Sequence, residues 1–199
     1  MAKMEKMVPH ILLWEVGQTK EEIEKKIWNS LTPRQIYDRV KSRGYHVVTG
    51  DKGGPTMCGV TLNTFKDWRK RMGKPMPGVN DLKTLQYDEW LAILKQMFWD
   101  PCKADQIHNQ SIAQMLVDWR WVNGTQAVRD AQTVLSCVAD GIVGPKTLGA
   151  LNAADSLSVF NRLKNARLRS YARIVERSPS QMRFYNGWVN RTNSITFTP

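Results

Sequence analysis

The chain has 199 residues, 42% of them hydrophobic, which suits one compact domain or two small ones built around a real core. Its 29 basic residues against 18 acidic ones give a net charge of +11, which favours a polyanionic partner without choosing among nucleic acid, acidic wall polymers and anionic lipid. The three cysteines and three histidines lie scattered without metal-ligand or redox spacing, which argues against a disulfide framework, a zinc site or another bound metal.

The first predicted helix spans the apolar positions from Val8 to Trp14 and ends near Gly17, with Glu15 in its last turn. A carboxylate at a helix C-terminus gains nothing from the helix dipole, so helix stability does not explain the position of Glu15. The N-terminus lacks the apolar run and cleavage site of a signal peptide, and no transmembrane segment is visible. We therefore expect the protein to be made in the cytoplasm.

Two short helices are predicted between residues 18 and 43. Thr19 and Glu22 form a capping box for the first, and its charged run is typical of a solvated helix face. Thr32 opens the second helix, which Gly44 closes.

A glycine-rich stretch comes next, at residues 50–62. Its four glycines and one proline exclude a helix interior and predict a tight turn or a short hairpin. Asp51 and Thr56 are the side chains on it that could touch a ligand. A simpler interpretation is a β-turn in which Asp51 bonds its own backbone and Thr56 caps the next segment of the chain.

Every predicted element after this turn is helical, so the expected fold class is mainly α with one small Gly-rich turn or β-hairpin. The apolar spacing places Trp14, Trp90 and Trp119 on buried helix faces. The expected helices run from near Thr61 to Gly73, from Leu85 to Trp99, from a Ser111 cap to Val122, through 127–135, from Pro145 to Leu151, from Leu157 to Arg177 and from Met182 to Trp188.

The helix at 157–177 carries a basic face that is either a solvated surface or a track for an acidic wall polymer. Its members are Arg162, Lys164, Arg167, Arg169, Arg173 and Arg177.

The segments 11–17 and 51–62 together resemble the signature of glycoside hydrolase family 108, which comprises bacterial and phage N-acetylmuramidases, some described as secretion activators. Similar motifs at 98–100, 140–147 and 187–191 occur in the same order, so the resemblance covers nearly the whole chain.

The resemblance implies a lysozyme-like helical fold in two regions. Residues 1–100 would form the muramidase-like catalytic region, with 18–43 as a helical insertion, and 101–199 a helical peptidoglycan-binding region packed with the first as one compact unit.

By this resemblance Glu15 is the catalytic acid, Asp51 the second carboxylate and Thr56 the residue that positions a water, in a two-carboxylate reaction that needs no cofactor or metal. A general acid must keep its proton near neutral pH, most simply by burial beside apolar groups. The residues expected to bind substrate are Gly53, Gly54, Tyr45, Trp188, Asn123 and Asp140. The turn around Asp140 also has a purely structural interpretation, because Asp-Gly forms turns and Gly-Pro starts helices.

The spacing departs from the family pattern, because Glu15 and Asp51 are 36 residues apart (51 − 15), an excess that the inserted helices would explain. An alignment without a gap instead places Ser42 at the acid position. The resemblance still implies a peptidoglycan hydrolase, and this departure makes a non-catalytic wall-binding or secretion-associated protein the alternative.

Binding of nucleic acid rests on charge alone, since no phosphate loop or recognised nucleic-acid motif is visible.

The expected partner is the glycan of the bacterial cell wall. Because synthesis is expected in the cytoplasm, action at the wall or in the periplasm would require a holin or another export helper.

Overall fold

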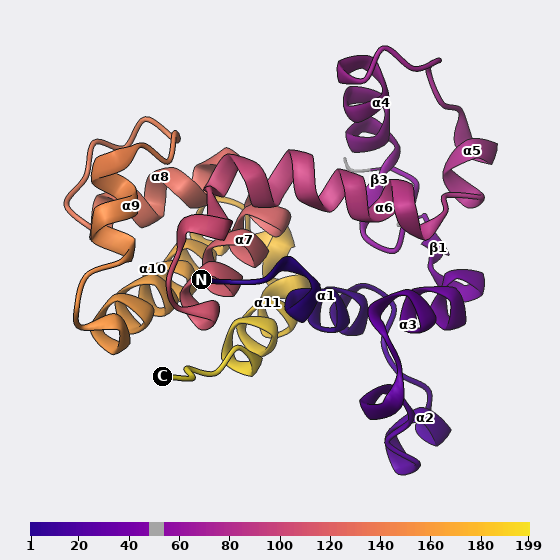
Figure 1. The fold of residues 1–199 in the computed structure, drawn as a ribbon, viewed down its shortest axis with the longest axis horizontal. Helices are drawn as coiled ribbons and strands as arrows, with labels where there is room; N and C mark the ends of the chain where they lie inside the picture. The colour runs from indigo at the N-terminus through magenta and orange to yellow at the C-terminus, as the bar shows by residue number, and fades with distance from the viewer. Residues whose placement is uncertain (48–53) are drawn as a thin grey trace. The chain divides into compact units, whose positions relative to one another are not determined.

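The computed structural model describes residues 1–47 and 54–199, and helices dominate them, as the sequence predicts (Figure 1). The expected hairpin is a small antiparallel sheet of three strands in the order β1-β2-β3. The chain divides into an N-terminal unit, Glu5–Met97, and a C-terminal unit, Phe98–Pro199 with Met1–Met4. Within the described residues, no helix is both long and apolar enough to cross a bilayer.

The N-terminal unit surrounds the sheet with short helices. Its helices are α1 (Val8–Glu15), α2 (Lys20–Glu24), α3 (Pro33–Val40), α4 (Leu62–Arg71), α5 (Val79–Lys83) and α6 (Tyr87–Ile93), which continues as a π-helical segment, Leu94–Trp99. The strands are β1 (Tyr45–His46), β2 (Thr56–Met57) and β3 (Val60–Thr61). In this register His46 lies opposite Thr56, and Thr56 opposite Thr61.

The predicted capping box of α2 is confirmed, and α3 begins with a second one. Thr19 Oγ1 accepts the Glu22 N–H, and Glu22 Oε2 accepts the Thr19 N–H at 2.8 Å. Thr32 and Gln35 form the equivalent pair at the start of α3. Each box satisfies two backbone N–H groups that have no partner within the helix.

Glu22 corrects the prediction of a solvated face, because it is only 1% exposed. Arg39 Nε and Arg43 Nη2 each donate to its carboxylate at 2.6 Å. Burial on its own would raise the pKa of Glu22, but the Thr19 N–H and the two guanidinium groups hold that pKa below its ordinary value. The periodicity of α2 does not reveal these partners, because they come from α3 and the turn after it.

Aromatic residues form the centre of the N-terminal unit. The Tyr37 ring packs at 5.6 Å from that of Tyr87 and 5.5 Å from that of Trp90. Trp90 is fully buried, as predicted, and its indole N–H donates to the Cys58 carbonyl at 3.0 Å, whereas Trp14 is only half-buried. This hydrogen bond anchors the β2–β3 turn to α6.

The C-terminal unit is a bundle in which α10 packs on α7, α8 and α11. Its helices are α7 (Gln110–Asn123), α8 (Thr125–Val134), α9 (Pro145–Leu151), α10 (Ser156–Arg177) and α11 (Met182–Ser194). The cap of α7 is Asn109 and not Ser111, because Asn109 Oδ1 accepts the N–H groups of Ser111 and Ile112. The last helix extends six residues beyond the predicted end at Trp188 (194 − 188).

Asp118 joins three helices of this bundle. Its carboxylate, 0% exposed, accepts from Arg167 Nη2 at 2.7 Å and from Arg191 through Nε and Nη2. Arg167 is also 0% exposed, and it donates a further hydrogen bond to Tyr171. The prediction that Arg167 belongs to the basic face of the helix at 157–177 is therefore wrong. A buried carboxylate between two guanidinium groups holds α7, α10 and α11 in one arrangement.

Replacing Asp118 by Asn should lower the free energy of unfolding by about 3–5 kcal/mol, because Arg167 would remain buried without its counter-charge. Asp130→Asn is the matched control, since it breaks an ion pair to the half-exposed Arg173 and should cost under about 1 kcal/mol. Urea denaturation measures both. Equal losses in the two variants would contradict a structural role for the buried carboxylate.

The Glu22 carboxylate should make stability depend on pH. Since its folded-state pKa is lowered, its contribution is complete above the ordinary value of 4.5 and is lost as the pH falls through the lowered value. Glu22→Gln should therefore cost about 2 kcal/mol at pH 7 and progressively less below pH 4.5. Denaturation of both proteins from pH 7 to pH 3 tests this, and a difference independent of pH would refute it.

Candidate active site

Glu15, the last residue of α1, is half-buried and packs against the β2–β3 turn. A β-carbon added at Gly59 would lie 2.5 Å from Glu15 Cδ and 2.7 Å from Oε2. The carboxylate therefore occupies space that any side chain at position 59 would need. Residues 44 positions apart in the sequence (59 − 15) thus meet at one point of the N-terminal unit.

The turn itself is a two-residue connection of Cys58 and Gly59, both with positive φ, 47° and 81°. Such a connection suits the right-handed twist of a hairpin. Cys58 is buried, its N–H donates to the Gly44 carbonyl at 2.9 Å, and a β-carbon at Gly44 would lie 2.4 Å from its Sγ. Burial, with a smaller contribution from the Glu15 charge, raises the pKa of the Cys58 thiol to about 12, so this cysteine is a neutral packing group.

Thr56 lies three residues before Gly59, on β2, and is 9% exposed. Its hydroxyl lies 2.9 Å from His46 Nε2 on the paired strand and 3.4 Å from the His46 carbonyl oxygen. When the hydroxyl donates to the carbonyl and accepts from the imidazole, one lone pair remains to accept from a water. Sequence reasoning missed His46, because only the β1–β2 register places it beside Thr56.

The other predicted residues of this region lie nearby or outside the described part of the chain. Tyr45, in β1, is half-buried, with Lys83 Nζ 4.9 Å from its ring centroid. Gly54 has φ of 67°, and no described atom lies within 4 Å of its β-carbon position. Asp51 and Gly53 fall outside the described residues.

Ser42, the acid position of the ungapped alignment, is exposed in the 3₁₀ segment Lys41–Arg43.

The three predicted substrate-binding residues of the C-terminal unit lie in different surroundings. Trp188, on α11, is half-buried and stacks on Tyr171 with centroids 5.2 Å apart. Asn123, the last residue of α7, lines a pocket of ≈ 410 Å³, whereas Asp140 lines another of ≈ 460 Å³. The structure therefore does not join them into one site.

Asp140 is engaged in its own turn. Its Oδ1 accepts from the Ile142 N–H and from Gln132 Nε2, both at 2.8 Å, and these bonds lower the pKa of its carboxyl group. Gln132 is 1% exposed and its Oε1 accepts the Gly141 N–H. These contacts match the structural interpretation of the Asp-Gly turn.

Two family models match adjacent parts of the chain. Residues 43–124 match Glycosyl hydrolase 108, and residues 124–193 match the Predicted Peptidoglycan domain. The expected resemblance to glycoside hydrolase family 108 is confirmed. The family 108 match contains Thr56, His46 and the turn at Gly59, while Glu15 precedes it.

The fold is similar to that of a protein of Brucella abortus in the solved "Structure of Brucella abortus SagA". The TM-score is 0.67 at 23% sequence identity, over 89% of this chain and 92% of that chain. This likeness shows a shared fold. Among curated proteins, none matches the sequence.

Gly59→Ala should lower the free energy of unfolding by about 1–3 kcal/mol more than Gly73→Ala. Both glycines have positive φ, but no described atom lies within 4 Å of the Gly73 β-carbon position, so Gly73→Ala reports backbone strain alone. In a Glu15→Ala background the two substitutions should cost the same, because the clash is removed. Urea denaturation measures all the variants, and equal costs in the wild-type background would contradict the packing of Glu15 on Gly59.

Proposed function

We propose that this protein is a peptidoglycan hydrolase, a lysozyme-type muramidase in which Glu15 is the general acid. The observation that carries the proposal is the packing of the Glu15 carboxylate against Gly59, in a turn that the family 108 match contains. The match to a peptidoglycan domain over 124–193 supports the cell-wall glycan as substrate.

In the proposed reaction Glu15 gives its proton to the oxygen of the glycosidic bond as that bond breaks. Asp51 is the second carboxylate, which either takes a proton from the attacking water or stabilises the positive charge on the sugar ring. The free lone pair of Thr56 would hold that water, and His46 would fix the orientation of the hydroxyl. Gly53 and Gly54 would let the backbone approach the glycan, and Tyr45 would offer it a ring face.

A second candidate is a non-catalytic wall-binding protein with the same fold. The observation that favours it is that the family 108 match begins at residue 43, which leaves Glu15 outside the matched residues. This candidate needs binding of the wall without turnover.

Release of reducing sugar from purified cell wall distinguishes the two candidates. Glu15→Gln keeps the size of the side chain but removes the acid, and should lower kcat by roughly 10²–10⁴-fold. Glu24→Gln is the matched control, since this glutamate is 62% exposed and pairs only loosely with Lys20, at 3.8 Å. The control should keep full activity.

Two results would defeat the assignment. Equal release by wild type and Glu15→Gln would remove Glu15 from the mechanism. Sedimentation of the wild type with insoluble wall, but without any sugar release, would establish the wall-binding alternative.

A further inference from the structure

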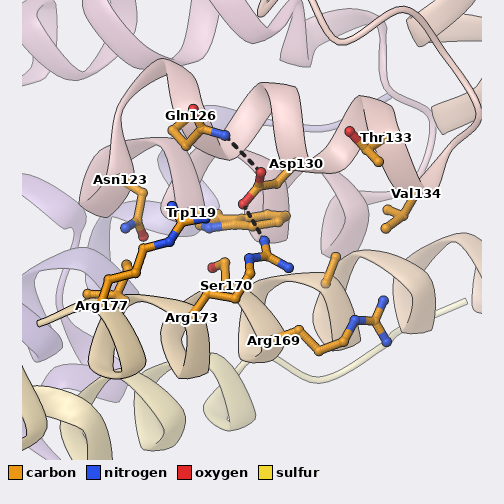
Figure 2. A pocket seen from close by; sticks show the side chains of 12 residues that line it. Trp119, Asn123, Gln126, Asp130, Thr133, Val134, Arg169, Ser170, Arg173 and Arg177 are labelled. Carbon is orange, nitrogen blue, oxygen red and sulfur yellow. Dashed lines mark hydrogen bonds and ion pairs between the residues drawn. The ribbon is translucent and has the colours of Figure 1, made fainter. Parts of the chain in front are cut away.

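A pocket of ≈ 410 Å³ lies among α7, α8 and α10 of the C-terminal unit. Arg169, Arg173 and Arg177 enter it from α10 at intervals of four residues, so their guanidinium groups share one helix face (Figure 2). Trp119 lies across it, with Asn123 and Arg177 at one end and Arg169 at the other (Figure 2).

The charge in this pocket is unbalanced. Arg173 Nη2 pairs with Asp130 at 3.1 Å, and Gln126 Nε2 donates to the same carboxylate at 2.9 Å. Arg169 and Arg177 are exposed and form no ion pair with any residue that the structure describes. Three guanidinium groups therefore face one carboxylate, which suits an anionic ligand.

Two buried polar atoms of the pocket lack a partner among the described residues. Trp119 is 0% exposed, yet its indole N–H has no acceptor among residues 1–47 and 54–199. Asn123 Oδ1 likewise has no donor among these residues. Buried donors and acceptors are nearly always satisfied in native proteins, so each exception needs an explanation. A ligand that accepts one hydrogen bond and donates another would provide it.

An amide offers that combination, and a carboxylate suits the arginines, since guanidinium binds carboxylates through two parallel hydrogen bonds. A phosphate polymer would satisfy the charge but has no N–H for Asn123 Oδ1. We propose that this pocket binds the peptide stem of peptidoglycan, with its carboxylates on Arg169 and Arg177 and a peptide unit beside Trp119 and Asn123. The choice of this peptide rests on the proposed function.

Calorimetric titration of the full chain with the synthetic stem tripeptide L-Ala-γ-D-Glu-meso-diaminopimelate tests the proposal. Arg169→Gln and Arg177→Gln should each weaken binding about tenfold, the usual effect of one charge-assisted contact. Lys164→Gln removes the same charge from the same helix outside the pocket, and should leave the dissociation constant within about twofold. Asp130→Asn should tighten binding, because it frees Arg173 and removes the opposing charge.

Two further ligands test the chemistry. The same tripeptide with its carboxylates amidated should bind at least about tenfold more weakly. Inorganic phosphate should not displace the free acid at equal concentration. Wild-type affinity in both arginine variants, or equal binding of the amidated peptide or of phosphate, would overturn the proposal.

The hydrolase function is measured separately as sugar release from glycan strands stripped of their peptides. The arginine variants should release sugar from them at the wild-type rate, whereas Glu15→Gln should lose release but keep the tripeptide affinity. Sugar release without tripeptide binding defeats the pocket alone. Arginine-dependent binding without release by the wild type supports the pocket and defeats the hydrolase.

Discussion

Each of the two units contains a carboxylate buried between two arginines. Glu22 is held by Arg39 and Arg43, and Asp118 by Arg167 and Arg191. Burying a carboxylate costs free energy unless charged donors surround it, so each carboxylate keeps its two arginines in place beside it. The first cluster ties the short helices at 18–43 to one another, and the second holds α7 against α10, the helix that carries the three arginines of the pocket.

The candidate active site depends on close contact between the Glu15 side chain and the backbone of the β2–β3 turn. Glu15 reaches the β2–β3 turn because Gly59 has no side chain, and the turn keeps its shape because both of its residues adopt positive φ. Strands of two residues cannot hold such a turn alone. The Trp90 bond to Cys58 and the contact of Gly44 with Cys58 supply the support that the sheet lacks. The Glu15 side chain, at the end of α1, therefore packs against a turn that other parts of the unit hold in shape.

The arginines that contribute to the net charge of +11 have different roles in the fold. Arg167 and Arg191 are structural, since both are buried on Asp118. Arg169 and Arg177, on the same helix as Arg167, are exposed and line the pocket. Residues 167 and 169 are two positions apart and so point away from each other on a helix, which is why one basic run serves both the core and a binding surface.

The sequence by itself determined most of the helices, the capping box of α2 and the small hairpin, because these depend on residues within a few positions of one another. It also supplied Glu15 and Thr56 as candidates through the family resemblance. Only the tertiary structure decided that Glu22 and Arg167 are buried, that His46 lies beside Thr56, and that Glu15 meets Gly59. For Glu22, Arg167 and Glu15, the deciding partner lies on another helix or turn. For His46 the partner lies on the paired strand, and local periodicity does not specify the register of that pairing.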